Sequence, residues 1–367
     1  MTPPHSAIPR VSIILSTFDR SALLPGALAA LREQADAPPY EILVVDNNST
    51  DETASVVAAA AAEDPRIRYI FEPRQGLSHA RNAGIAAAAA PVLAFTDDDV
   101  RADRHWVRAI AETFERHRDA WFVGGRVLPR WPAPPPAWLT ERHWAPLALC
   151  GVEEEFRSDA AYPYPLVGAS LAVRREVFAR LGHFAAEVQR VRDGIGSSED
   201  HDFLLRAWAA GGHGIYSPRI VVTADVQPER MERAYHRRWH RAHGRFAARM
   251  TRAVPPGTER RHAEATLFDL PAWFYRRVAA AALDYLKGLG RAPAERQAQR
   301  EHRLLQLVAY VGEHARGRAG GAGWVLAVPR EVARFGAALV RKKLRRGAPA
   351  PPNLARRRTD IYAFNGF

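Results

Sequence analysis

The stretch VLAFTDDD, residues 92–99, is a short apolar run that ends in three consecutive aspartates. A run of this length with polar residues after it predicts a buried strand. Neighbouring carboxylates about 4 Å apart repel each other by roughly 4 kcal/mol at an effective dielectric near 20. A divalent cation held by carboxylates and substrate phosphates is the common way to relieve that repulsion. The alternative is a polar turn before the next helix, with Asp103 as a competing N-cap.

Strand and helix signals alternate through the first half of the chain. Apolar runs predict strands at residues 11–16, 41–46, 67–71 and 91–96, and helical patterns occupy residues 21–34, 51–63 and 78–90. This alternation indicates a parallel sheet with helices on both faces. Ligands bind beyond the carboxyl ends of such strands. Three polar clusters fall at those ends, at residues 16–19, 46–48 and 97–99, and we expect them to line one crevice.

Composition narrows the class of protein. With 367 residues and 47% hydrophobic content, the chain can build a substantial core in one or two domains. The single cysteine, Cys150, excludes an internal disulfide and fits a reducing compartment. The first residues lack a signal-peptide pattern, and the apolar runs are shorter than the ~20 residues of a membrane span. We therefore expect a cytoplasmic protein, either soluble or peripheral on the inner face of the cell membrane.

The later part of the chain differs from the first. The segment 129–138 is rich in proline, which cannot continue a helix or a central strand, and it predicts a linker or an ordered loop. Strand signals end near residue 225. Residues 231–250, 271–289, 295–314 and 331–346 predict helices, with Asp269 as the N-cap of the second. These patterns predict one domain at residues 1–225 and a basic, mostly helical region at 226–367.

The net charge of +12 indicates anionic partners, for which nucleic acid, anionic lipid and nucleotides are all candidates. Aromatic and aliphatic residues near Trp273 lie among arginines, a pattern that suits an anionic membrane interface, a packed helical subdomain or a homo-oligomer contact. His236 and His240 are four residues apart on a predicted helix. They could share one metal ion, but a solvated basic face is the more frequent arrangement.

Five segments, in this order and spacing, carry a resemblance to a known family. They are VSIILSTF (11–18), VVDNNSTD (44–51), GLSHARNAG (76–84), FTDDD (95–99) and SEDHDF (198–203). Together they resemble the family 2 glycosyltransferases with the GT-A fold, over roughly residues 10–225. The resemblance implies an α/β fold of the GT-A type, in which helices flank a Rossmann-like, mostly parallel sheet. A C-terminal α-helical extension follows it in this chain.

The resemblance also implies a reaction. A sugar would pass, with inversion, from a nucleoside-diphosphate-sugar donor to a hydroxyl of a glycan or lipid-linked acceptor. Asp97 and Asp99 match the acids that hold Mg²⁺ or Mn²⁺ across the donor diphosphate, with Asp98 as an alternative ligand or sugar contact. Asp200 matches the catalytic base, which takes the proton of the acceptor hydroxyl. The neighbouring Asp202 is equally well explained as a helix cap.

The same resemblance assigns binding residues. Asp46 would accept a hydrogen bond from a base N–H, and Phe18 stands where the family commonly has a tyrosine against the base. Glu199 and Gly168 would contact the acceptor. The remaining nucleotide-sugar contacts are assigned to Ser16, Thr17, Arg81, Asn82, Asp97 and Asp98. For Arg81, a pair with diphosphate or base oxygens competes with a surface ion pair.

Three other functions compete with sugar transfer. A catalytically silent nucleotide-sugar-binding scaffold would keep the fold without turnover, although intact acidic clusters speak against it. A nucleic-acid-binding protein is suggested by charge alone, because no recognised basic-aromatic module is present, and we expect no nucleic-acid partner. A nucleotidyltransferase would carry a glycine-rich phosphate loop after the first strand, which residues 16–20 lack.

Overall fold

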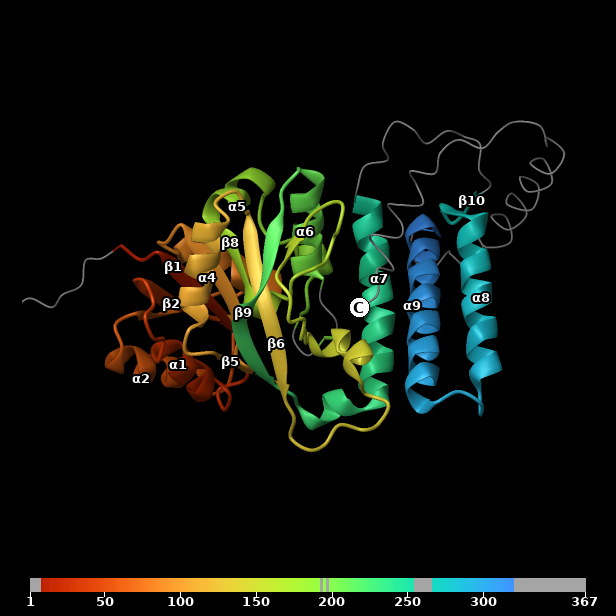
Figure 1. Ribbon diagram of the computed structural model, residues 1–367, viewed down its shortest axis with the longest axis horizontal. Helices are drawn as coiled ribbons and strands as arrows, with labels where there is room; N and C mark the ends of the chain where they lie inside the picture. The colour runs from red at the N-terminus through yellow and green to blue at the C-terminus, as the bar shows by residue number, and fades with distance from the viewer. Residues whose placement is uncertain (1–7, 192–193, 196–197, 254–265, 320–367) are drawn as a thin grey trace, which may run out of the picture. The chain divides into compact units, whose positions relative to one another are not determined.

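The computed structural model describes residues 8–191, 194–195, 198–253 and 266–319 (Figure 1). The helix predicted at 331–346 lies outside these residues. The chain divides into two compact units, one made of residues 1–135 and 144–231 and the other of residues 136–143 and 232–367. The first unit contains the central sheet, and the described residues of the second include three long helices.

The first unit begins with the predicted alternation. Its parallel strands β1 to β4 lie in the order β3-β2-β1-β4. The bounds are β1 Val11–Thr17, α1 Leu24–Arg32, β2 Tyr40–Asp46, α2 Thr53–Glu63, β3 Ile67–Phe71, α3 Leu77–Ala87 and β4 Val92–Asp97. Every residue of β1 and β2 is buried, which explains why these strands read as continuous apolar runs. The predicted strands and helices of this half are confirmed.

Helices cover both faces of this part of the sheet. At Gly84 of α3, an added Cβ would lie only 2.5 Å from a methyl carbon of Ile14, so α3 packs directly on β1. Tyr40 of β2 donates its hydroxyl to the carbonyl oxygen of Leu31 in α1 at 2.9 Å. Ile14 pairs in register with Leu43, and side chains alternate along a strand, so Ile14 and Tyr40 point to opposite faces. Helices α3 and α1 therefore lie on opposite sides.

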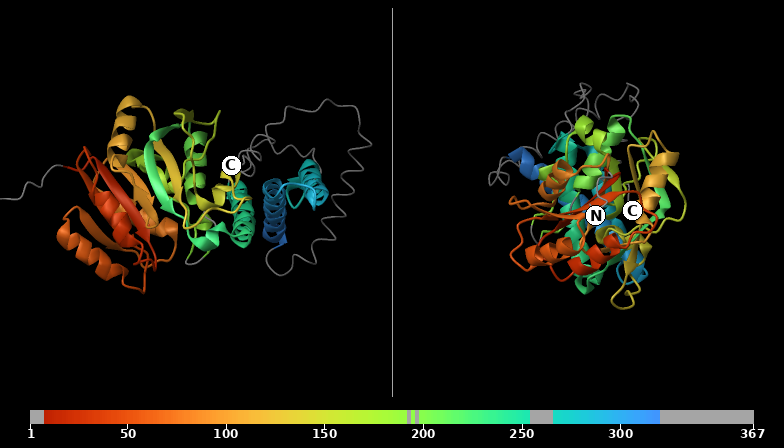
Figure 2. Two further views of the ribbon diagram at one scale, coloured as in Figure 1. Left: turned by 60° about the horizontal axis from the view of Figure 1, so that its bottom comes forward. Right: turned by 90° about the vertical axis from the view of Figure 1, so that its left-hand side faces the viewer.

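The rest of the sheet is mixed. β8 lies antiparallel to β4 and β6, β6 is parallel to β9, and β5 and β7 pair antiparallel with β9. In Figure 2 strands β6 and β9, yellow and green, continue the sheet beside the red and orange strands. The parallel pairings are the longer ones, so the sheet is mostly parallel. The remaining bounds are β5 Val100–Ala102, α4 Trp106–Arg116, β6 Phe122–Arg130, β7 Phe156–Ser158, β8 Leu171–Arg174, α5 Arg175–Leu181, α6 Glu199–Ala209 and β9 Gly214–Asp225.

Strand β6 corrects one prediction. The proline-rich segment from Pro129 predicts a linker or loop that cannot continue a central strand, but β6 continues through Pro129 to Arg130. β8 accompanies β6 only along residues 122–124, and Pro129 is registered with Ala224 of β9 on the other side. A strand that is paired on one side at this point tolerates a residue without an N–H.

The second unit contains α7 Arg233–Ala253, α8 Ala272–Gly288 and α9 Ala294–Ala319, with α9 between the other two (Figure 1). These helices were predicted, but the N-cap Asp269 was wrong, because Pro271 holds that position. Asp269 and Phe268, with φ of 63° and 50°, instead form the turn between β10 Thr266–Leu267 and β11 Leu270–Pro271. Among the described helices, none combines the length and the apolar character needed to cross a membrane.

Short 3-10 turns complete the described elements. They are η1 Glu141–His143, η2 Ala145–Leu147, η3 Gly168–Ser170, η4 Ala186–Val188 and η5 Pro228–Met231. Two of them matter for the site, because η3 leads directly into β8 and η5 follows the end of β9. Both turns belong to the first unit.

Candidate active site

The three polar clusters meet at one edge of the sheet. The parallel register sets Thr17 of β1 beside Asp46 of β2, and Ser16 beside Asp97 of β4. The Thr17 hydroxyl donates to Oδ2 of Asp98 at 2.8 Å, which ties the end of β1 to the aspartate run. Side chains separated by tens of residues are thereby collected where ligands bind in sheets of this kind.

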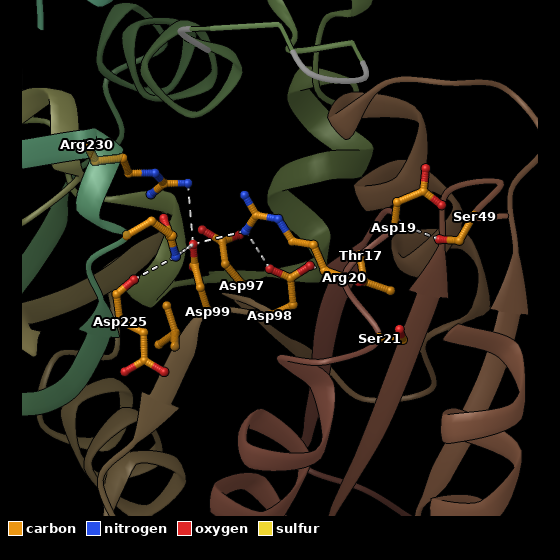
Figure 3. A network of polar contacts seen from close by, with 12 residues as sticks. Thr17, Asp19, Arg20, Ser21, Ser49, Asp97, Asp98, Asp99, Asp225 and Arg230 are labelled. Carbon is orange, nitrogen blue, oxygen red and sulfur yellow. Dashed lines mark hydrogen bonds and ion pairs between the residues drawn. The ribbon is translucent and has the colours of Figure 1, made fainter. Parts of the chain in front are cut away.

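Asp98 and Asp99 are buried in the turn between β4 and β5 and share one cation. Nη1 of Arg20 donates to Oδ1 of Asp98 at 2.9 Å and to Oδ2 of Asp99 at 3.0 Å. The same Asp99 oxygen lies 3.2 Å from Nε2 of Gln227 and 3.4 Å from Nη2 of Arg230 in η5 (Figure 3). Guanidinium groups therefore offset the repulsion between two adjacent buried carboxylates.

The two carboxylates respond differently to this environment. Burial raises the pKa of Asp98 to about 6, although Arg20 offsets part of the effect. Burial acts on Asp99 in the same direction, but Arg230, Arg20 and Arg190 together lower the pKa of Asp99. Asp99 lies beside the guanidinium groups of both Arg20 and Arg230, and these positive charges favour its ionised form.

Arg81 joins the aspartates of β4 to the second acidic cluster. Its guanidinium is buried, with Nη1 2.7 Å from Oε1 of Glu199 and Nη2 3.4 Å from Oδ1 of Asp97. Glu199 is the first residue of α6 and precedes Asp200. Acidic groups about a hundred positions apart in the chain therefore meet on one guanidinium. Because protein carboxylates engage this guanidinium, its contact with a nucleotide stays a prediction.

Asp200 is the second residue of α6 and lies in the first turn of that helix. Its Oδ2 accepts the N–H of Gly168 at 3.0 Å, and its Oδ1 accepts the N–H of His201 at 2.7 Å. Burial raises the pKa of Asp200, and the charge of Arg81 opposes the shift. A carboxylate with a raised pKa binds a proton more readily, as a general base requires.

Gly168 lies directly against the Asp200 carboxylate, whereas Asp202 pairs with a residue further along α6. A Cβ at Gly168 would lie 2.9 Å from Oδ2 of Asp200 and 2.9 Å from Nη2 of Arg81, so a side chain there would collide with both. Asp202 lies within α6 and pairs with Arg206 one turn later at 2.9 Å, a common helix-surface pair. The absence of a side chain at Gly168 thus permits the contact between η3 and the acidic cluster.

Some of the residues predicted to bind the nucleotide already have hydrogen-bond partners within the protein, and others do not. Both oxygens of Asp46 accept bonds, from the Ser49 N–H at 2.9 Å and from the Tyr69 hydroxyl at 2.7 Å. Burial, together with its bond to Asp46, raises the pKa of Tyr69 to about 12. The Ser16 hydroxyl is buried and has no hydrogen-bond partner among the described residues. Phe18 is half-buried.

Asn82 has a structural role in the first unit. Its carboxamide donates to the carbonyl oxygen of Phe184 at 3.0 Å and accepts the Phe184 N–H at 3.1 Å. These two bonds fasten α3 to the segment after α5. The predicted contact of Asn82 with the nucleotide stays a prediction.

Four site residues were missed by the sequence analysis: Arg20, Tyr69, Gln227 and Arg230. Arg20 directly follows the polar cluster at residues 16–19, and a search for cations to balance three aspartates would have found it. Tyr69 follows from strand order, since Val44 and Tyr69 are registered neighbours and Val44 shares a face with Asp46. Gln227 and Arg230 come after the predicted domain boundary at 225, where no pattern connected them with the sheet.

The site has the chemistry for a hard divalent cation but not a complete ligand set. Among the described residues, no group of three or more His, Cys, Asp or Glu side chains could hold a metal ion. Asp97, whose side chain is 32% exposed, and Asp99 offer carboxylate oxygens. Mg²⁺ is usually held by one or two carboxylates plus substrate phosphates, so these residues fit Mg²⁺ or Mn²⁺ that arrives with a diphosphate.

The histidines of the second unit form a buried cluster. His236 of α7 is fully buried, its ring stacks on His302 of α9 with centroids 5.6 Å apart, and it lies 4.8 Å from Trp138. His240 stacks on the same His302 ring at 4.4 Å. The expected solvated basic face is therefore wrong at His236, because α7 turns this side toward α9. These histidines, like the other described residues, do not form a group of three or more side chains that could hold a metal ion.

Known proteins resemble the first part of this chain. Residues 12–182 match the family described as glycosyl transferase family 2. The uncharacterized glycosyltransferase Mb0553 of Mycobacterium bovis is 30% identical over 217 residues, which are 57% of this chain and 86% of that protein. The glucosyl-dolichyl phosphate glucuronosyltransferase of Haloferax volcanii is 24% identical over 213 residues, covering 56% of this chain and 66% of the relative.

Solved structures are similar at lower identity. A mannosyltransferase from Pyrobaculum calidifontis, solved with GDP-Man and Mn²⁺, is 22% identical; the match covers 93% of this chain and 89% of that one, with a TM-score of 0.49. This chain therefore spans slightly less than two thirds of the length of the Haloferax relative named above.

Proposed function

Because the chain belongs to glycosyl transferase family 2, we propose that it moves a sugar, with inversion, from a nucleoside-diphosphate-sugar donor to a hydroxyl acceptor. One observation carries the proposal. The guanidinium of Arg81 contacts both Asp97, at the sheet edge, and Glu199, next to Asp200. A donor-side acid and a candidate base are therefore neighbours in one site, as a direct displacement requires.

On the donor-sugar side, Asp46 would accept a hydrogen bond from the nucleoside and Ser16 would donate one. The assignment of Ser16 has more support than that of Asp46, because the Ser16 hydroxyl is buried and has no hydrogen-bond partner among the described residues. Asp97 and Asp99 would hold Mg²⁺ or Mn²⁺ against the diphosphate. When bound, such a cation stabilises the negative charge that develops on the leaving nucleoside diphosphate.

On the acceptor side, Asp200 would take the proton of the attacking hydroxyl. The acceptor oxygen forms its bond to the anomeric carbon while the bond from that carbon to the diphosphate oxygen breaks, and the proton passes to a carboxylate oxygen of Asp200. The N–H groups of Gly168 and His201 fix the carboxylate, and each bonded oxygen retains a lone pair for the proton. Positioned bases of this kind contribute ~10²–10⁴-fold to the rate.

The acceptor is proposed from the relatives' names. The Haloferax relative is named for a dolichyl phosphate-linked sugar, which supports a lipid-linked or glycan acceptor for this chain. A lipid-linked acceptor would be met at a membrane surface, so we place the reaction in the cytoplasm at the inner membrane face. We keep the catalytically silent scaffold as the competing function, because it would present the same fold.

A donor screen separates these two functions. The full chain is incubated with UDP-, GDP- and dTDP-sugars and Mn²⁺, melting temperature reports binding, and released nucleoside diphosphate reports turnover. A ligand at 100 times its Kd adds about 2.7 kcal/mol of stability. We expect one nucleotide class to raise the melting temperature and to be slowly hydrolysed or transferred. A stabilising donor that is never cleaved, with any glycan or lipid-linked acceptor supplied, would favour the scaffold.

A further inference from the structure

We infer that Arg20 is an exchangeable counter-ion of the donor site: it holds the position between Asp98 and Asp99 in the free protein and leaves it for the diphosphate when a divalent cation and donor bind together. The inference rests on the proposed function and adds a residue to it. It makes cation binding and nucleotide binding interdependent.

Nη1 of Arg20 occupies the position between the two carboxylates, where a bound cation would also lie. Nη1 of Arg20 lies 2.9 Å from Oδ1 of Asp98 and 3.0 Å from Oδ2 of Asp99. Divalent cations bind carboxylate oxygens at about 2.0–2.6 Å. A cation on that Asp99 oxygen and a guanidinium nitrogen in the same place would overlap and repel each other. A cation that binds in the position between Asp98 and Asp99 must therefore displace Arg20.

The backbone around Arg20 is fixed, so the side chain alone is free to move. Oδ1 of Asp19 accepts the Thr50 N–H at 2.7 Å, and Oδ2 of Asp51 accepts the Ser21 N–H at 2.8 Å. Ser49 accepts the Asp19 N–H at 3.0 Å (Figure 3). These bonds anchor the residues on both sides of Arg20 to the loop after β2. The guanidinium remains near the site wherever its rotatable side chain turns.

Exposure separates Arg20 from the other arginine of the site. The Arg20 side chain is 28% exposed, whereas that of Arg81 is 4% exposed. Arg20 therefore has a path toward solvent or a bound ligand, and Arg81 does not. A diphosphate offers oxygens that a planar guanidinium binds well. Arg230, on the same Asp99 oxygen, leaves that carboxylate with a partner during the exchange.

Linkage gives the inference a measurable consequence. Mn²⁺ alone must displace Arg20 without giving it a new partner, so it binds weakly. With a nucleoside diphosphate present, Arg20 gains phosphate oxygens and the cation gains ligands, so each ligand raises the affinity of the other by the same factor. Removing the charge of Arg20 should strengthen binding of Mn²⁺ alone and reduce this coupling.

The test measures free Mn²⁺ by electron paramagnetic resonance in titrations with Mn²⁺ alone and with saturating UDP, GDP or dTDP. A protein-free titration with the same nucleotide is subtracted, because the nucleotide itself binds Mn²⁺. Wild type, Arg20→Ala and Arg20→Gln are compared with Arg10→Ala, which removes a guanidinium from an exposed pair with Glu115. We expect nucleotide to tighten Mn²⁺ binding at least tenfold in wild type and in Arg10→Ala. Both Arg20 variants should bind Mn²⁺ alone about tenfold more tightly, equivalent to about 1.4 kcal/mol, with weaker coupling.

The outcomes distinguish the inference from the proposed function. If the Arg20 variants bind Mn²⁺ alone no more tightly than wild type, while wild type still binds Mn²⁺ with nucleotide, the inference is overturned and the function stands. If wild type binds none of UDP, GDP and dTDP with Mn²⁺, both are overturned. Arg20→Gln keeps hydrogen-bond donors and decides the result if Arg20→Ala melts before the titration temperature.

Discussion

Two arginines of the same site have opposite environments. Arg81 is enclosed between Asp97 and Glu199, and a Cβ on Gly168 would already crowd its guanidinium. Arg20 reaches Asp98 and Asp99 from an anchored loop and keeps part of its side chain in solvent. Burial on all sides makes the first a fixed link between two acidic clusters. Partial exposure makes the second a counter-ion that a ligand can replace.

Arg81→Ala should break the site most severely. It removes the shared partner of a buried glutamate and of Asp97, and losing one member of a buried ion pair costs about 3–5 kcal/mol. Arg20→Ala should cost less, because Thr17 still donates to Asp98 and Arg230 still lies beside Asp99. Urea unfolding of both variants, followed by circular dichroism, tests the contrast. Equal losses of stability would mean that Arg20 is as structural as Arg81.

The buried histidines of the second unit differ from both arginines, because burial keeps them neutral. Burial, with the neighbouring His236 and His143, lowers the pKa of His302 to about 3. An unfolded histidine takes up its proton near pH 6.5, so the stabilisation is complete above that pH and is lost as the pH falls toward 3. We expect the second unit to lose about 1.4 kcal/mol per pH unit across this window.

Urea unfolding at pH 7, 6 and 5 measures that slope. His302→Gln should flatten it, whereas His183→Gln, which changes an exposed histidine of the first unit, should leave it unchanged. A slope that is the same in all three proteins would show that other groups control the acid sensitivity.

The smallest effect, on membrane binding, is expected from the exposed leucines of α8. Helix α8 exposes Leu283 and Leu286 by 57% and 58%, and Lys287 lies next to them. Leucines beside cations suit an anionic membrane interface. Leu283→Ser with Leu286→Ser should weaken sedimentation with phosphatidylglycerol vesicles several-fold while leaving binding to phosphatidylcholine unchanged. Loss of self-association, with vesicle binding unaltered, would instead identify this surface as a contact between copies.

The sequence predicted the first half of the fold well because strand and helix periods are local properties. Apolar runs located β1 to β4, and their ends located Thr17, Asp46 and Asp97. Partners contributed by distant elements were not predictable in the same way. Arg230 reaches Asp99 because β5, which begins directly after Asp99, pairs with β9, and η5 follows β9. No local pattern encodes that topology. Pro129 and Asp269 were misread for a related reason, since strand pairing and a hairpin turn outweighed local preference.

The site residues also differ in whether local sequence or long-range contacts identify them. Asp97 and Asp200 followed from the resemblance, and Arg81 proved to connect them through contacts that sequence spacing does not contain. Tyr69 is exposed on an edge strand and looked like an ordinary strand aromatic, yet it donates to Asp46. Charge balance around buried carboxylates is the physical signal that would have identified Arg20.

The most direct test of the central claim is the turnover of Asp200→Asn beside Asp202→Asn. Both substitutions remove one charge from the same helix, but Asp202 pairs with Arg206 rather than with the site. We expect Asp200→Asn to keep the donor Kd within a few-fold while kcat falls ~10²–10⁴-fold, and Asp202→Asn to keep kcat near wild type. Near-normal turnover of Asp200→Asn with full donor binding would contradict the account.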